Sequence, residues 1–566
     1  MSPPSASPDA PPSNLGTIGV VAKDAAVTGT TKAGGSEPLT LQAIRARREK
    51  EGKLVAPTAS YSDSDMFKSP ANLSKPKARK WDHLFSEESA SRQPCMLKQA
   101  ARHLKKPGMI SLGGGIPSPE NFPIEELSMK VPKPPHFNRN PAVEEILENE
   151  EISVGKYDVS ERGAIFDLSI ALNYGQSIGA AQLLRWVTEH TELVYNPPYA
   201  DWRCSLTIGS TGALEAALRM LCDRARNDSL LTEEYAFATA LETAAPLGIR
   251  LFGVAMDGEG LRADSLDEIL SNWDVAARGG ARKPTVLYTV PSGQNPTGAT
   301  MGEQRRRDVY EVCCKHDVFI LEDEPYYFLQ MPDYKGKASN GASTANGHTE
   351  LSEDATAEAF LKTLIPTLLS MDRDGRVLRM DSFSKVVVPG SRVGWITATE
   401  QVIERYIRHA ECASQGPAGI SQLLLYKLVD ETWGHAGYLR WLMSLRDGYA
   451  RRRDTLLGAC EDYLPRDVVS WVPPKAGMFL WLAIDHTKHP DFARGKNKSI
   501  LDIEQDLFDA CIEQGVLACR GSWFRAETDK DPSGLFFRVT FAAAAPNDVR
   551  TAIERFGAAV RKTFAL

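Results

Sequence analysis

One lysine stands among residues whose types and spacing favour chemistry. Lys385 follows two serines in the run Ser382-Phe-Ser384-Lys385, and Arg392 comes seven residues later. The apolar runs on either side of this cluster predict two strands, so the cluster lies on the turn that connects them. In α/β proteins, the loops at strand ends carry the functional side chains. A lysine amine held between two such strands is poorly exposed to solvent.

A buried lysine amine has a lowered pKa, and such an amine can form a Schiff base with an aldehyde. Serine hydroxyls and an arginine guanidinium are suited to binding a phosphate monoester. Pyridoxal phosphate carries both an aldehyde and a phosphate group, and the cluster around Lys385 therefore indicates a site for this cofactor. The alternative is a surface turn whose charges are solvated, and this stretch by itself does not decide between the two.

A second candidate for phosphate binding is the run Gly209-Ser210-Thr211-Gly212. It stands between a predicted strand and a predicted helix, where the free N–H groups of the first helical turn and the helix dipole favour an anion. Ser210 and Thr211 add two hydroxyl groups. The alternative is an ordinary helix cap, which serine and threonine form often.

The stretch from Pro291 to Gly298 also follows a predicted strand and contains Asn295. The side-chain amide of Asn295 can donate a hydrogen bond to the phenolate oxygen of pyridoxal phosphate. An asparagine before a proline is also a common turn former, which is the alternative interpretation.

The run Glu322-Asp323-Glu324-Pro-Tyr-Tyr327 follows another predicted strand. It places carboxylates about three residues before a tyrosine. A carboxylate beside the pyridine nitrogen of the cofactor keeps that nitrogen protonated, which makes the ring an electron sink. The segment therefore indicates the partner of the ring nitrogen.

The elements that must position these residues alternate between strands and helices from about residue 178 onward. Strands are predicted at 204–208, before Glu233-Glu234, and at 249–254, 284–290, 318–321, 377–380 and 393–396. Helices are predicted at 180–190, 213–226 and 302–316. This alternation predicts an α/β fold with a mostly parallel sheet flanked by helices, and the strand ends form its site.

The chain after residue 397 predicts a smaller α+β domain. It contains a long helix near 438–463, strands at 476–482, 515–519 and 535–541, and a final helix over 547–564. We expect a largely disordered tail over 1–80 with one short helix within 39–53. The other parts are an arm with part of the small domain over 81–177, a large cofactor-binding domain over 178–430 and a small domain over 431–566. A flexible insertion is predicted at 335–355.

The composition excludes several classes of function. The 566 residues carry a formal net charge of −7 and no long basic stripe outside 45–53, which argues against nucleic-acid binding. No apolar run approaches the roughly 18 residues of a membrane helix, and the N-terminus lacks a secretion signal. Nine scattered cysteines without a Cys-x-x-Cys pair predict reduced thiols, not disulfides or zinc ligands. We expect a cytoplasmic protein that acts on small molecules without a metal.

Five motifs occur in the order of the class I aminotransferases, which are fold-type I enzymes dependent on pyridoxal phosphate. They are Gly209-Ser210, Asn295-Pro-Thr-Gly298, Glu322-Asp-Glu-Pro-Tyr-Tyr327, Ser382-Phe-Ser-Lys385 with Arg392, and Phe537-Arg538. From about Trp81 to the C-terminus, the chain resembles the fungal aromatic amino acid aminotransferases and the kynurenine and 2-aminoadipate aminotransferases. The resemblance implies ping-pong transfer of an amino group from phenylalanine, tyrosine or tryptophan to 2-oxoglutarate.

The resemblance also implies roles for single residues. Lys385 would hold the cofactor covalently and act as general base and acid. The phosphate would be bound by Ser210, Thr211, Ser382, Ser384 and Arg392. The phenolate oxygen would be bound by Asn295 and Tyr327, with Asn295 also near the substrate. Phe237 would stack on the ring, and Arg538 would clamp the α-carboxylate of the substrate. Gly114 and Gly115 would form a wall near the substrate. Tyr174 would reach the phosphate of the neighbouring subunit, in a homodimer with shared sites.

One position departs from the family pattern. The family has an aspartate directly before Pro-Tyr-Tyr, whereas this chain has Glu324 there and Asp323 one place earlier. Counting three residues back from Tyr327, we expect Glu324 to contact the pyridine nitrogen. Because neighbours in a strand face opposite sides, we expect Asp323 to point away.

Two other functions stay open. Another fold-type I reaction, such as a decarboxylation or an elimination, uses the same kind of site, and product analysis with and without an added oxo acid separates these reactions. A regulator that senses pyridoxal phosphate needs a DNA-binding domain upstream. Residues 1–80 show no helix-turn-helix pattern and the chain is acidic, so the sequence favours the enzyme.

Overall fold

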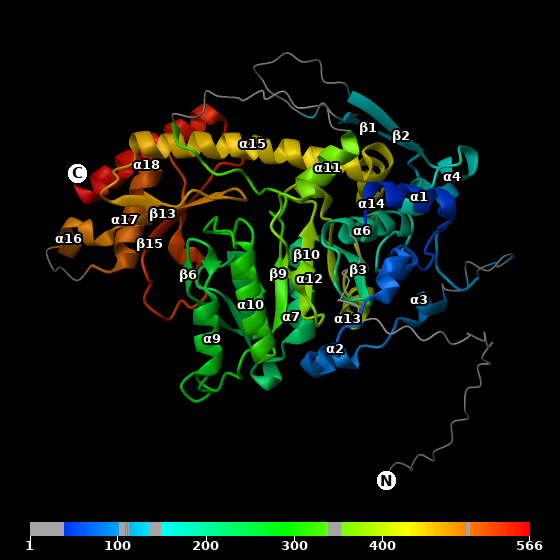
Figure 1. The fold of residues 1–566 in the computed structure, drawn as a ribbon, viewed down its shortest axis with the longest axis horizontal. Helices are drawn as coiled ribbons and strands as arrows, with labels where there is room; N and C mark the ends of the chain where they lie inside the picture. Colours follow the sequence, from blue (N-terminus) through cyan, green and yellow to red (C-terminus); the bar gives the residue numbers. More distant parts are fainter. Residues whose placement is uncertain are drawn as a thin grey trace, which may run out of the picture. The chain divides into compact units, whose positions relative to one another are not determined.

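The computed structural model describes residues 39–100, 103, 108, 110, 112–134, 137, 149–337, 352–493 and 498–566, apart from the side chains of Gln99 and Ala493. Its largest sheet has seven strands in the order β3-β11-β10-β9-β8-β4-β5, and Figure 1 labels β3, β9 and β10 of this sheet. The strands are β3 (Trp202–Thr207), β4 (Ser229–Glu233), β5 (Arg250–Val254), β8 (Val286–Thr289), β9 (Phe319–Asp323), β10 (Val377–Ser382) and β11 (Gly394–Thr399). Strand β11 is antiparallel to both of its neighbours, and the other four pairs are parallel.

This sheet is buried because its strands carry apolar residues toward both faces. Strands β4, β8, β9, β10 and β11 are buried along their whole length, as in parallel sheets with helices on both sides. The helices of this part are α6 (Ala181–Val194), α7 (Gly209–Leu221), α8 (Ala238–Ala244), α9 (Ala263–Ser271), α10 (Glu303–His316), α11 (Glu353–Leu361), α12 (Leu368–Met371), α13 (Glu400–Cys412) and α14 (Gly419–Tyr426), with a small hairpin of β6 (Met256–Asp257) and β7 (Gly260–Leu261). The expected α/β class with a mostly parallel sheet is confirmed.

The C-terminal part of the chain forms a second sheet that is antiparallel throughout. Its strands, in spatial order, are β12 (Val469–Trp471), β13 (Phe479–Ile484), β15 (Leu535–Thr540) and β14 (Cys519–Arg520). Its helices are α16 (Pro490–Ala493), α17 (Ile500–Glu513) and α18 (Pro546–Phe564). The long helix α15 (Gly434–Tyr463) runs from α11 to α18 (Figure 1). This part is the smaller α+β portion of the fold.

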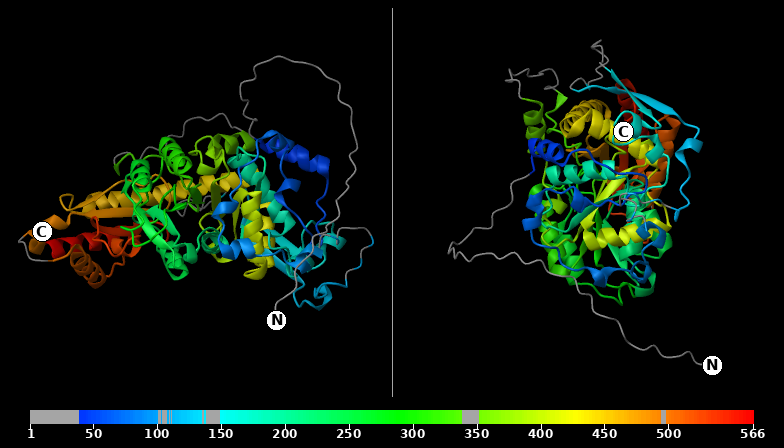
Figure 2. Two further views of the ribbon diagram at one scale, coloured as in Figure 1. Left: turned by 90° about the horizontal axis from the view of Figure 1, so that it is seen from below. Right: turned by 90° about the vertical axis from the view of Figure 1, so that its right-hand side faces the viewer.

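Residues 39–80 fold onto the rest of the chain, which corrects the expectation of a largely disordered tail in that range. Helix α1 (Leu41–Glu51) buries Leu41 and Ile44. On the same helix, Arg48 forms ion pairs with Glu189 of α6 and with Asp430. Figure 2 shows the ribbon of this region from two further sides. The short helix expected within 39–53 is therefore present. The first 38 residues of the expected tail lie outside the described residues.

The elements between α1 and α6 are short. They are α2 (Glu87–Ser91), α3 (Met96–Ala100), the antiparallel pair β1 (Glu126–Pro132) and β2 (Asn149–Gly155), α4 (Asp158–Glu161) and α5 (Leu168–Ala171). The insertion expected at 335–355 falls mainly on residues 338–351, which are outside the described part. All nine cysteines belong to the described part and none forms a disulfide.

Several predicted elements begin or end at other residues than the observed ones, and two of them show the reasons. The helix expected at 213–226 is α7, which begins at Gly209 and ends at Leu221, since Gly209, Ser210, Thr211 and Gly212 form its first turn. The strand expected at 515–519 is only the two-residue β14, since α17 occupies residues 500–513 and the chain must turn before pairing with β15. Within the residues that the structure describes, no helix has the length and apolar character needed to cross a membrane.

Candidate active site

A cavity of about 350 Å³ lies where the carboxyl ends of β8, β9 and β10 approach the C-terminal sheet. Its walls include the start of α7, the residue before α8, and residues of β13 and β15. The lining residues are Ser210, Thr211, Phe237, Tyr288, Val290, Asn295, Asp323, Pro325, Tyr326, Ser382, Ser384, Lys385, Pro389, Arg392, Phe479 and Arg538. Five segments that are far apart in the sequence are thus brought together, and they are the segments that carry the five motifs.

Lys385 lies in the turn between β10 and β11, three residues after β10 ends. Its side chain is half-buried. Burial lowers the pKa of its amine, and the positive charges of Arg392 and Arg538 lower it further. A lowered pKa increases the neutral fraction of the amine, which is its nucleophilic form. The alternative of a solvated surface turn does not fit this environment.

A cluster of hydroxyls and a guanidinium lies beside Lys385. Ser382 Oγ donates a hydrogen bond to Ser384 Oγ over 2.9 Å, and Arg392 Nη1 donates to the same oxygen over 3.2 Å. Gly209 makes room for the arginine, because a Cβ atom at this position would lie 2.5 Å from Arg392 Nη2. The φ angle of Gly209 is +80°, a conformation that favours glycine. Both the close approach and the backbone therefore require glycine here.

Ser210 and Thr211 lie in the first turn of α7 and not at its cap. The cap residue is Ile208, and no side chain caps the helix, so the alternative of an ordinary Ser/Thr cap does not hold. The first N–H groups of a helix lack partners within the helix and attract anions. Ser210 Oγ is buried and has no hydrogen bond of normal geometry to another described residue. Together with Arg392, these donors fit a phosphate group.

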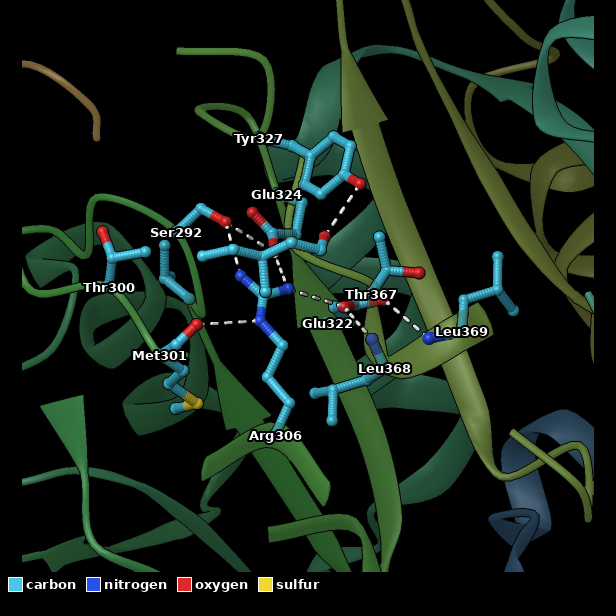
Figure 3. Close-up of polar contacts among 12 residues, drawn as sticks. Ser292, Thr300, Met301, Arg306, Glu322, Glu324, Tyr327, Thr367, Leu368 and Leu369 are labelled. Atoms are coloured by element: carbon cyan, nitrogen blue, oxygen red, sulfur yellow. Dashed lines mark hydrogen bonds and ion pairs between the residues drawn. The ribbon is translucent and has the colours of Figure 1, made fainter. Parts of the chain in front are cut away.

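The orientation expected for Asp323 and Glu324 is wrong. Asp323 lines the cavity, where its Oδ2 atom accepts a hydrogen bond from the Tyr288 hydroxyl over 2.9 Å. Burial raises the pKa of Asp323 to about 6. Glu324 does not line the cavity, because its Oε1 atom accepts hydrogen bonds of 3.1 Å from both Arg306 and Ser292 (Figure 3). Neighbours do face opposite sides, as expected, but the assignment of the sides was reversed.

The same shift by one residue applies to the two tyrosines. Tyr326 lines the cavity, and its ring packs edge-on against that of Phe479 with 5.8 Å between centroids. Tyr327 points away and donates a hydrogen bond to the carbonyl of Ile365 over 3.0 Å (Figure 3). The expected role of Tyr327 at the phenolate oxygen is therefore corrected. The spacing of three residues between carboxylate and tyrosine holds for the pair Asp323 and Tyr326.

Asn295 and Arg538 connect the loop after β8 with the C-terminal sheet. Arg538 donates from Nη1 to Asn295 Oδ1 over 2.8 Å, and its Nη2 lies 3.2 Å from Cys519 Sγ. The guanidinium carbon also lies 4.5 Å from the ring of Phe479 and 4.7 Å from that of Phe524, within range of cation–π attraction. Arginine carries five N–H donors, so this fixed guanidinium keeps donors for a carboxylate.

Besides Glu324 and Tyr327, three further predicted residues do not line the cavity. Gly114 and Gly115 are exposed, and Tyr174 is 63% exposed. Their expected roles, as a wall near the substrate and as a contact from a neighbouring subunit, stay predictions.

Several cavity residues were missed from the sequence, above all Asp323, Tyr326, Tyr288 and Phe479. Tyr288 and Phe479 lie within predicted strands, and the alternation of side chains along a strand was the available signal. That signal leaves two faces to choose from. The choice depends on pairing with neighbouring strands, which the sequence pattern does not reveal.

Known proteins provide comparisons for most of the chain. The family profile described as aminotransferase class I and II matches residues 168–556. An aromatic amino acid aminotransferase of Schizosaccharomyces pombe is 45% identical over 491 residues, which cover 85% of this chain and 98% of that protein. A mitochondrial kynurenine/alpha-aminoadipate aminotransferase of Bos taurus is 30% identical over 488 residues, covering 84% of this chain and 97% of that protein. The crystal structure of aminotransferase Aro8 from Candida albicans has a TM-score of 0.79 and 38% identity, and the match covers 87% of this chain and 100% of that one.

Proposed function

Because the chain belongs to the class I and II aminotransferases, we propose that it transfers the amino group of an aromatic amino acid to 2-oxoglutarate with pyridoxal phosphate as cofactor. The observation that carries this proposal is that Lys385, Arg392 and Asp323 line one cavity. An amine, a guanidinium and a carboxylate match the aldehyde, the phosphate and the ring nitrogen of the cofactor. The name of the relative from Schizosaccharomyces pombe supports an aromatic donor.

Ten of the residues lining the cavity suit parts of the cofactor. Lys385 would carry it covalently, and Asp323, in place of Glu324, would contact the ring nitrogen. Tyr326, in place of Tyr327, would bind the phenolate oxygen together with Asn295. The ring would stack on Phe237, and the phosphate would be held by Ser210, Thr211, Ser382, Ser384 and Arg392. When bound, pyridoxal phosphate supplies an electron sink for charge that develops at the α-carbon of the amino acid.

Proton transfer and substrate binding would be carried out by side chains of the protein. Lys385 Nζ is the amine in the cavity that can take a proton from the α-carbon and return it at the end of the transfer. Arg538 would bind the α-carboxylate with two parallel hydrogen bonds, which fixes the direction of the Cα–H bond. Tyr326 and Phe479 present aromatic faces for the side chain of the donor.

A second candidate donor is 2-aminoadipate or kynurenine, which the name of the bovine relative suggests. 2-Aminoadipate carries a second carboxylate and needs a second anion-binding group. The cations among the residues lining the cavity are Lys385, Arg392 and Arg538, and each already has a proposed partner. Because 2-oxoglutarate carries a distal carboxylate too, this count of cations does not distinguish the donors, and we favour aromatic donors because the relative that is 45% identical is named for them. We expect the glycine turn around 114–117 to approach the distal carboxylate of 2-oxoglutarate.

We further propose that two copies of the chain share their sites and that the protein is cytoplasmic. The exposed Tyr174, which does not line the cavity of its own chain, supports a role toward a second subunit. In a shared-site dimer, mixing Tyr174→Phe with Lys385→Ala subunits creates hybrids in which one site is intact. Regained activity on mixing would support sharing, and no gain with hybrids present would contradict it.

The proposal is tested on the purified protein. Borohydride reduction followed by peptide mapping should place the cofactor on Lys385, and a label elsewhere would overturn the site. A panel of donors at fixed 2-oxoglutarate should rank aromatic amino acids first in kcat/KM. If alanine or aspartate leads by about tenfold, worth about 1.4 kcal/mol, the aromatic assignment fails and the aminotransferase assignment survives.

A further inference from the structure

A buried arginine lies beneath the cavity without lining it. Arg306, on α10, has a side chain that is fully buried. Its Nη1 donates to Glu324 Oε1 over 3.1 Å, its Nη2 to Ser292 Oγ over 2.8 Å, and its Nε to the carbonyl of Met301 over 3.1 Å (Figure 3). Ser292 Oγ in turn donates to the same oxygen of Glu324 over 3.1 Å. One guanidinium thus joins three separate points of the chain.

Two of these points are the ends of one loop. Ser292 and Met301 bound the loop that carries Asn295, and Met301 N also donates to the carbonyl of Pro291 over 2.8 Å, which closes the loop. Asn295 faces the cavity and accepts the hydrogen bond from Arg538. The hydrogen bonds of Arg306 to both ends therefore hold the base of the loop that presents Asn295.

The third point is Glu324, the residue directly after β9. Asp323 and Tyr326 reach the cavity from the two sides of this residue along the chain. Because adjacent side chains of an extended chain face opposite directions, the bond that holds Glu324 toward Arg306 directs Asp323 toward the cavity. The same bond fixes the register that brings Tyr326, and not Tyr327, to the cavity.

We propose that Arg306 is a positioning residue that sets the geometry of Asn295, Asp323 and Tyr326 toward the cofactor. This inference rests on the proposed use of pyridoxal phosphate. Arg306 does not line the cavity, so its effect passes through Ser292 and Glu324. Supporting residues of this kind typically alter affinity or activity by about 10- to 100-fold when they are removed, as in the outer shells of metal sites.

The charges around Arg306 allow a test that separates positioning from stability. The buried cluster contains two cations, Arg306 and Arg379, and three carboxylates, Glu322, Glu324 and Asp381. Removing Arg306 alone leaves Glu324 buried without its partner, which is strongly destabilising, whereas replacing both members of a buried pair by apolar residues is often tolerated. The double substitution also leaves the net charge of the cluster unchanged.

The variants are Arg306→Met, Arg306→Lys and the double variant Arg306→Met with Glu324→Met. The control is Arg376→Met, since Arg376 is equally buried but precedes β10 at the end opposite to Lys385. Each protein, stripped of cofactor, is titrated with pyridoxal phosphate to obtain its dissociation constant. The absorbance of the bound cofactor is then followed against pH, and the melting temperature of the cofactor-free protein is measured separately.

We expect Arg306→Met to raise the dissociation constant by about 10- to 100-fold and to shift the pH midpoint of the absorbance. Arg306→Lys should recover part of the affinity, since lysine keeps the charge but not the forked donors. The double variant should regain thermal stability but not affinity, and Arg376→Met should lose stability alone. Wild-type affinity and an unchanged pH midpoint in the double variant would overturn the inference. Failure of the wild-type protein to bind pyridoxal phosphate would instead overturn the proposed function.

Discussion

Asp323 and Glu324 are adjacent residues whose carboxylates serve opposite sides of the chain. Asp323 lines the cavity that contains Lys385 and accepts a hydrogen bond from Tyr288, whereas Glu324 lies in the buried cluster around Arg306. The chain thus separates two carboxyl groups that follow one another in sequence. The carboxyl group of Asp323 faces the cavity, and that of Glu324 fixes the backbone that positions Asp323.

This separation predicts different results for two amide substitutions. Asp323→Asn removes the charge that would keep the ring nitrogen protonated, so kcat should fall by 100-fold or more, on the order of 3 kcal/mol or more in the barrier. Glu324→Gln keeps the acceptor oxygen for Arg306, so its kcat should stay within about tenfold of the wild type, a change under about 1.4 kcal/mol. Steady-state kinetics with tyrosine and 2-oxoglutarate measure both. The reverse ranking would restore Glu324 as the partner of the ring nitrogen.

Gly209→Ala should weaken the binding of pyridoxal phosphate. The added Cβ would meet Arg392 Nη2 at 2.5 Å, so the guanidinium must move away from Ser384. Loss of one charge-assisted hydrogen bond, about 1.5 to 3 kcal/mol, corresponds to a rise in the dissociation constant of roughly 10- to 150-fold. The positive φ adds about 1–2 kcal/mol of backbone strain, visible as a lower melting temperature.

Gly390→Ala is the matched control for this glycine. It lies two residues from Arg392, no atom is within 4 Å of its Cβ position, and its φ is outside the left-handed region. Its affinity for pyridoxal phosphate should equal that of the wild type. Equal losses in both variants would mean that flexibility of the turn, and not contact with Arg392, determines binding.

Arg538→Lys should lower kcat/KM for the amino acid and for the oxo acid alike. Both substrates carry an α-carboxylate, and lysine replaces a forked donor with a single point charge. The expected loss is about 1.5–3 kcal/mol, or roughly 10- to 150-fold. The affinity for pyridoxal phosphate, measured by absorbance, should fall less than kcat/KM, because Arg538 is assigned to the substrate and acts on the cofactor only through its hydrogen bond to Asn295. A loss confined to the oxo acid would contradict a common carboxylate site.

The segments of the site could be predicted from the sequence, whereas the face of each segment could not. The hydrophobic pattern located β9 and β10 to within two residues, and Asp323, Tyr326, Ser384 and Lys385, at or just after their carboxyl ends, line the cavity. In Glu322-Asp323-Glu324, alternation already groups the two glutamates on one side and Asp323 on the other. Which side meets the cavity depends on Arg306, a residue of α10 that contacts the two glutamates. This contact cannot be read from the sequence of the Glu-Asp-Glu stretch alone.

The folding of residues 39–80 could not be predicted for a related reason. The segment is polar and α1 has only two buried residues, so its composition resembles that of a disordered tail. Part of its attachment comes from Arg48, which pairs with Glu189 and Asp430, residues more than 140 positions away in the chain. Ionic contacts over such separations leave no periodic signal.

The attachment of α1 should be sensitive to acid. Burial alone would raise the pKa of Glu189, but hydrogen bonds from His435 and Arg48 lower this pKa from an ordinary 4.5 to about 2. A carboxyl group with a lowered pKa in the folded state stabilises the fold above its ordinary pKa, and this stability is lost as the pH falls toward the folded value. The loss should therefore develop between about pH 4.5 and 2 and amount to on the order of 3 kcal/mol.

Arg48→Met should remove much of this contribution at pH 7, because it leaves Glu189 buried with weaker partners; the expected loss is on the order of 3 kcal/mol. Arg45→Met is the control on the same helix, since Arg45 pairs with Asp354 at the surface, where such pairs contribute roughly 0–1 kcal/mol. Urea unfolding at pH 7, 4.5 and 3 compares the variants. Below pH 4.5, the wild type should lose stability faster than Arg48→Met, because the variant no longer has the arginine that holds the pKa of Glu189 down. Parallel pH profiles for the two proteins would show that the acid sensitivity arises elsewhere in the chain.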